Sequence, residues 1–163
     1  MPGKPQPTKP IEILFSYAHE DEDLRDRLEK HISTLKRNNR IVCWHDRNIR
    51  AGSTWNRAIS EHLDTAQIIL LLISADFLDS EYCNTVEVKR ALQRHKKGEA
   101  CVIPVILRPA DWHDEKFAQL QALPRDGKPV VKWSDPDEAL VEVAKGIKKV
   151  VIDLENAQKQ TPT

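Results

Sequence analysis

The sequence predicts an α/β domain built on a parallel β-sheet, and three observations support this fold class. Short apolar runs alternate along the chain with longer segments whose apolar residues recur at helical spacing. The strongest run, Gln67 to Ile73, is apolar on both faces, as a strand covered on both sides of a parallel sheet must be. Five strand-like runs suit a flavodoxin-like, three-layer domain with a five-stranded parallel sheet in the order 2-1-3-4-5.

The first half of the chain contains three of the expected strands. They fall at residues 11–15, 41–44 and 67–73. Residues 21–36 form the first expected helix, because four apolar residues (Leu24, Leu28, Ile32 and Leu35) share one face. Its front is acidic and its end is basic, which suits the helix dipole. Ser53 or Thr54 can cap a second helix that runs through Leu63.

The second half continues the alternation. A helix is expected from Ser80 to Lys96, with Gly98 ending it, and is followed by a strand at 101–107. The long loop 108–126 is expected to hold a short helix at 115–121, before a fifth strand at 130–133. The segment Asp135-Pro-Asp-Glu138 provides a capping residue, a proline in the first turn and an acidic third position, so it predicts the start of the last helix.

Length and composition set the domain organisation. The 163 residues suit one domain, expected at 11–154. The proline-rich segment 1–10 is predicted to be a flexible leader, and the polar segment 155–163 a flexible tail.

Charge and cysteine usage exclude several classes of protein. The net charge is zero, so neither nucleic acid nor a membrane surface is an expected partner. The longest apolar run, 68–73, is too short to span a bilayer, and no secretory signal pattern is visible. The three cysteines are far apart and form no CxxC pair, which is typical of reduced thiols in a cytoplasmic protein and predicts no metal site.

The predicted strand order indicates where a site would lie. It places a switch point at the carboxyl ends of the first and third strands, where ligands bind in this architecture. The segments Ser16-Tyr17-Ala18-His19 and Ser74-Ala75-Asp76 should flank this crevice, and the helix carrying Glu87 starts just after the second segment.

Several kinds of enzyme are disfavoured by the motifs. Neither GxGxxG nor GxxxxGK[ST] can be written with the five glycines, which disfavours a standard Rossmann dehydrogenase or P-loop enzyme. A nucleotide, if bound, would be bound without such a glycine-rich loop. There is no GxSxG for a hydrolase triad. A phospho-aspartate receiver would need acidic residues that converge on one magnesium ion, and the spacing of its candidates (Glu20, Asp21, Asp76 and Lys132) does not favour this.

Glu87 has two interpretations from the residues alone. The first is a solvated helix carboxylate paired with Arg90 three residues on, and spacing by itself favours it. The second is a carboxylate held in a water-poor crevice. Cys83 and Ala91, one turn away on either side, are small neighbours for a charged group.

Four segments of the chain resemble Toll/interleukin-1 receptor (TIR) domains, most closely the bacterial branch. The stretch I11-E-I-L-F-S-Y-A-H-E-D-E-D23 resembles the first conserved box, and W44-H-D-R-N-I-R-A-G-S-T-W55 resembles the loop after the second strand. The stretch I68-I-L-L-L-I-S-A-D-F-L-D-S-E-Y-C83 is similar to the family's third strand and the serine, phenylalanine, serine and aromatic-cysteine run that follows it. Val131-Lys-Trp133 is similar to the family's short late box. The resemblance covers residues 11–151.

The resemblance implies one of two functions. Many bacterial and plant TIR domains cleave NAD+ to nicotinamide and ADP-ribose or cyclic ADP-ribose, with a glutamate on the helix after strand three, which here is Glu87. Three residues separate Cys83 from Glu87, where the common pattern has two. The other function is that of a non-enzymatic adaptor that only assembles with other TIR domains.

For the enzymatic function, the resemblance implies NAD+ as substrate, no cofactor and no metal. It further implies self-association, which completes the site, and a role in bacterial defence or signalling. Besides Glu87 as the catalytic residue, the expected substrate-binding residues are Ser16, Tyr17, Ala18, His19, Asp46, Arg47, Gly52, Trp55, Tyr82 and Cys83.

Overall fold

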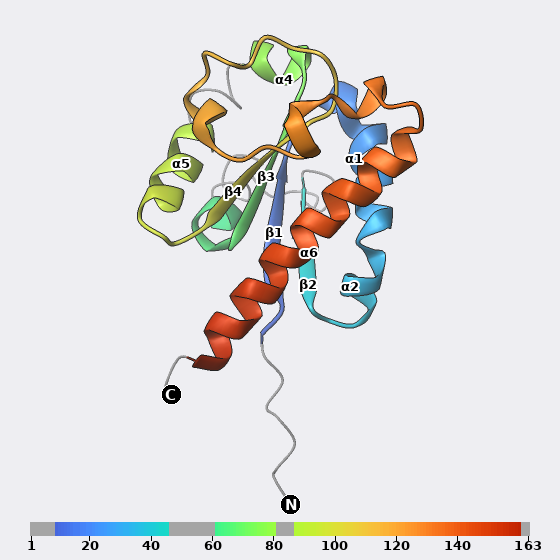
Figure 1. Ribbon diagram of the computed structural model, residues 1–163. Coiled ribbons are helices and arrows are strands. Elements are labelled where there is room, and N and C mark those ends of the chain that lie inside the picture. The colour runs from blue at the N-terminus through green and yellow to red at the C-terminus, as the bar shows by residue number, and fades with distance from the viewer. Residues whose placement is uncertain (1–8, 46–60, 81–86, 161–163) are drawn as a thin grey trace, which may run out of the picture.

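The computed structural model describes residues 9–45, 61–80 and 87–160. Four strands, β1 (Ile11–Ser16), β2 (Ile41–Trp44), β3 (Ile68–Ile73) and β4 (Cys101–Ile106), form a parallel sheet in the order β2-β1-β3-β4 (Figure 1). All six residues of β3 are buried, as its uninterrupted apolar run predicted. The flavodoxin-like α/β fold is therefore confirmed.

Helices cover both faces of this sheet and give three layers (Figure 1). One face packs on α1 (Glu22–His31), α2 (Ser33–Arg37) and the long α6 (Pro136–Gln160). The other face packs on α5 (Val88–Lys96) and on the helical residues 61–65. Alternate residues of each strand point to the two faces, so the core is divided into two clusters by the sheet.

Short helical elements occupy the carboxyl edge of the sheet. After β1 comes a 3₁₀ turn, η1 (His19–Asp21), and after β3 comes α4 (Ala75–Asp79). Three further 3₁₀ turns, η4 (Lys116–Gln119), η5 (Arg125–Gly127) and η6 (Val130–Lys132), lie in the segment between β4 and α6.

The prediction of a fifth strand at 130–133 is wrong. Val130 to Lys132 form the turn η6, and Val130 reaches the core from that turn instead of from a strand. The place beside β4 is taken by Leu123, which forms a single parallel bridge with Val105. Pro124 follows at once, and because proline has no N–H to donate, the ladder cannot extend beyond this bridge.

Two helix boundaries also differ from the prediction. The helix expected over 21–36 is broken at Ile32, whose φ of −111° and ψ of 15° are not helical, so α1 and α2 are separate. The last helix continues to Gln160, past the expected domain end at residue 154. Arg40 stabilises this extension, because Nε and Nη2 donate to the two Glu155 carboxylate oxygens at 3.1 and 2.7 Å.

Candidate functional site

Glu87 and Ser16 meet at the carboxyl edge of the sheet. Ser16 is the last residue of β1 and Glu87 directly precedes the first residue of α5, and the two are 3% and 5% exposed. Ser16 Oγ donates a hydrogen bond of 2.5 Å to Glu87 Oε2. An ionised carboxylate can only accept, so the hydroxyl is the donor when Glu87 is charged. The interpretation of Glu87 as a solvated carboxylate is therefore wrong, and Arg90 forms an ion pair with Asp64.

Glu87 is buried, and the apolar residues near it on α5 are buried as well. Val88 and Ala91, on its own helix, are buried in the same hydrophobic cluster as Ala18, which follows β1. A carboxylate in such a setting is poorly hydrated, so its charge acts on a nearby positive charge more strongly than it would in water. The geometry therefore suits electrostatic stabilisation of a developing cation.

A second polar cluster lies on the same edge of the sheet. Asp21 in η1 is 1% exposed, and its carboxylate accepts hydrogen bonds from Ser74 Oγ and, at 2.7 Å, from Arg108 Nε. Arg108 also donates through Nη2 to Asp76 at 2.5 Å. Ser74 caps α4 by accepting a hydrogen bond from the Phe77 N–H at 3.1 Å. These contacts join the segments that follow β1, β3 and β4.

This cluster bears on the phospho-receiver alternative. Two of the three candidate carboxylates for a receiver, Asp21 and Asp76, are bonded to the Arg108 guanidinium. Lys132 is exposed in η6. Within residues 9–45, 61–80 and 87–160, no three His, Cys, Asp or Glu side chains are placed to hold a metal ion.

The structure separates the other predicted residues of the first box. Ala18 is buried on the same face of the sheet as Val88. Tyr17 packs against the opposite cluster, where its ring lies 5.4 Å from the Arg25 guanidinium carbon and its hydroxyl donates to Glu22 at 3.4 Å. His19 is exposed at the start of η1. The remaining predicted residues lie outside the described part of the chain: Asp46, Arg47, Gly52, Trp55, Tyr82 and Cys83.

Arg108 is not among the residues predicted from the sequence, and Asp21 appears there only as a candidate receiver carboxylate. Arg108 comes two residues after the end of β4. Because the ends of parallel strands meet at one edge, the argument that located Ser16 and Ser74 applies equally to Arg108. What the sequence could not give is the choice of Asp21 and Asp76 as its partners.

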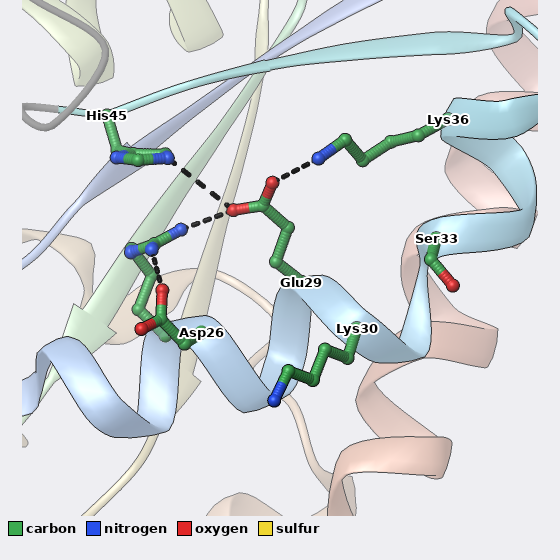
Figure 2. Close-up of a pocket in the computed structure, with 7 residues that line it drawn as sticks. Asp26, Glu29, Lys30, Ser33, Lys36 and His45 are labelled. Carbon is green, nitrogen blue, oxygen red and sulfur yellow. Dashed lines mark hydrogen bonds and ion pairs between the residues drawn. The ribbon is translucent and has the colours of Figure 1, made fainter.

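A separate polar cavity of about 530 Å³ lies between α1, α2 and the end of β2 (Figure 2). Glu29 stands at its centre, bonded to Arg25 and Lys36, with His45 Nε2 at 3.6 Å. Burial by itself raises the pKa of Glu29, but the hydrogen bonds from Lys36 and Arg25 outweigh burial and hold the pKa below its ordinary value. The contacts of Glu29 therefore connect His45, which follows β2, to the helices α1 and α2.

Among the residues that the structure describes, no helix is both long enough and apolar enough to cross a bilayer.

Comparison with known proteins identifies relatives of this chain. A sequence model of the TIR domain matches residues 13–141. The uncharacterized protein y4lF of Sinorhizobium fredii is 55% identical over 137 residues, which are 84% of this chain and 42% of that protein. The 2′ cyclic ADP-D-ribose synthase BtTIR of Bacteroides thetaiotaomicron is 24% identical over 110 residues, which are 67% of this chain and 35% of that protein.

Two solved structures share the fold. The TIR domain of the Toll-related receptor TRR-2 from Hydra magnipapillata superposes with a TM-score of 0.58 at 17% identity, covering 85% of this chain and 96% of that one. The TIR domains of the activated Roq1 resistosome superpose with a TM-score of 0.50 at 19% identity, covering 83% and 84%. The chain spans less than half the length of the curated relatives it matches.

Proposed function

This chain belongs to the TIR domain family, and from that premise we propose that it is an NAD+ hydrolase. The bond cleaved is the N-glycosidic bond between nicotinamide and ribose, and the products are nicotinamide with ADP-ribose or cyclic ADP-ribose. The observation that carries the proposal is Glu87, a buried carboxylate bonded to Ser16 at the carboxyl edge of the sheet. A relative named as a cyclic ADP-ribose synthase supports the same chemistry.

The reaction asks little of the protein beyond charge and shape. The nicotinamide ring of NAD+ carries a positive charge and leaves as a neutral molecule, so its departure needs no general acid. The ribose becomes an oxocarbenium-like cation at the transition state. Glu87 is the proposed catalytic residue, because a buried carboxylate stabilises that cation more than it stabilises the substrate.

The rest of the site is proposed to come from segments beside Glu87. Substrate contacts from residues 46–55 and from Tyr82 and Cys83 remain predictions, as does completion of the site by a neighbouring copy. Aromatic rings at Trp55 and Tyr82 would stack on nicotinamide or adenine. A requirement for self-association would make activity depend on protein concentration, and it would suit a protein that acts in the cytoplasm in bacterial defence or signalling.

The test is release of nicotinamide from NAD+ by the protein at high concentration or crowded on beads. We expect release by the wild type and at least a hundredfold less by Glu87→Gln, in line with the loss of one preorganised electrostatic group. Glu138→Gln is the matched control, because Glu138 is exposed on α6, on the opposite face of the sheet from α5.

The outcomes separate the enzymatic function from its alternative. Release that survives Glu87→Gln would contradict the assignment of Glu87. An absence of release by the crowded wild type would favour the non-enzymatic interaction module. Product analysis by mass then distinguishes ADP-ribose from a cyclic product, which is lighter by one water.

A further inference from the structure

We propose that Ser16 is a positioning residue, which acts on the reaction through Glu87 and makes no direct contact with NAD+. This inference rests on the proposed function. The resemblance implied that Ser16 binds substrate, but its geometry favours another role. Its side chain is 3% exposed, and its hydroxyl already donates to Glu87 Oε2 at 2.5 Å. The single O–H donor of Ser16 is therefore already used, and a substrate group could accept from it only by displacing the carboxylate.

The position of Ser16 in the sheet makes it a rigid donor. It pairs with Leu71 of β3 in the parallel ladder between β1 and β3. Leu71 is fully buried, and so is the rest of β3. A hydroxyl on a central strand is held more firmly than one on a loop, so it can fix the orientation of the group it bonds.

The hydrogen bond from Ser16 connects Glu87 to the sheet. It lies where α5 begins, and its own side chain accepts no hydrogen bond from an N–H of the first turn as a capping residue would. The bond to Ser16 links Glu87 to a residue 71 positions earlier in the sequence. Through this bond the carboxylate is oriented by the sheet as well as by its own helix.

The bond also has a chemical consequence. Ser16 donates to the ionised carboxylate, which is the form that stabilises a sugar cation. Removing the hydroxyl takes away one constraint on a group that must be placed within about half an ångström, while leaving the substrate-binding surface in place. The loss should therefore fall on kcat, because it weakens a transition-state interaction and not ground-state binding.

The kinetic experiment compares Ser16→Ala with the wild type in the crowded nicotinamide-release assay over a range of NAD+ concentrations. We expect kcat to fall about 10- to 100-fold and KM to stay within about twofold. Ser16→Cys, which keeps a weaker donor of similar size, should lie between the two. Ser134→Ala, an exposed serine before α6, is the control and should match the wild type.

A second measurement does not depend on activity. Urea unfolding of Ser16→Ala, Glu87→Ala and the double variant forms a double-mutant cycle. If the two side chains are bonded in solution, the double variant loses less stability than the two single losses added together. An additive cycle would overturn the inference.

The kinetic outcomes distinguish this inference from the function it rests on. Wild-type release with an unchanged kcat in Ser16→Ala would overturn the inference and leave the proposed function standing. A raised KM at unchanged kcat would also overturn it, because that pattern indicates direct substrate contact. An absence of release by the wild type would overturn both.

Discussion

Arg108 Nε donates a hydrogen bond of 2.7 Å to Asp21 Oδ1, and this contact joins the segment after β4 to the segment after β1. The two residues are 87 positions apart in the sequence. Because Asp21 also accepts from Ser74, one buried carboxylate connects three of the four strand ends. The edge of the sheet that carries Ser16 is thus braced by an ionic cluster beside it.

Asp21→Asn should destabilise the protein. The substitution removes the charge that compensates Arg108 and one acceptor for Ser74. We expect a loss of about 2 kcal/mol in the free energy of unfolding, less than for a fully buried pair, because the Arg108 side chain is 34% exposed. Urea denaturation measures it. Asp23→Asn, at an exposed aspartate in the first turn of α1, is the control, and an equal loss in both variants would contradict the prediction.

Glu29 should make stability depend on pH. Its pKa is lowered in the folded protein from an ordinary value of 4.5, so its ionised form contributes stability above that value. This contribution is lost as the pH falls through the folded pKa, because the unfolded chain then binds the proton more readily than the folded one does. The difference in unfolding free energy between the wild type and Glu29→Gln should therefore be largest above about pH 5 and shrink toward pH 3.

Chemical denaturation at several pH values measures this difference. Glu138→Gln controls for the removal of an exposed charge. A difference between the wild type and Glu29→Gln that is the same at pH 7 and at pH 3 would contradict the prediction.

Cys43 should resist alkylation in the folded protein. Burial, together with the negative charge of Glu29, raises the pKa of the Cys43 thiol from 9.0 to about 12. At pH 8 the thiolate should be about a thousandfold scarcer than in the unfolded chain. Iodoacetamide labelling followed by peptide mass spectrometry should find Cys43 modified rapidly only in urea. Modification at the same rate without urea would show that the thiol is accessible and ionised.

Arg94 should anchor the helical residues 61–65 to α5. Its Nη1 atom donates to the carbonyl oxygens of Leu63 and Ala66 at 2.7 and 2.6 Å, which are acceptors left over at a helix end. Arg94→Ala should cost about 1 to 3 kcal/mol of stability. Arg94→Lys should recover only part of this lost stability, because lysine keeps the charge but cannot reproduce the fork of donors.

Thermal unfolding tests the Arg94 prediction, with Arg37→Ala on the exposed face of α2 as control. Equal melting temperatures for Arg94→Ala and the wild type would contradict it.

Sequence reasoning reached most of the fold because its signals are local. The apolar run 68–73 had to be a central strand, since a fully apolar strand is stable only when both of its faces are covered. The same reasoning failed at 130–133, where a fifth strand is predicted and the structure has the turn η6. Periodicity reports which residues are buried, but it does not report whether a neighbouring backbone is free to pair with them.

For the candidate site, the sequence by itself determined which residues stand at the carboxyl edge of the sheet. Strand order and the positions of strand ends place Ser16 and Ser74 there, and family resemblance directed attention to Glu87. Only the tertiary structure decided that Glu87 is buried and bonded to Ser16, and that Arg108 is held by Asp21. These pairings join residues 71 and 87 positions apart. They depend on how separate loops pack against one another, which no local spacing encodes.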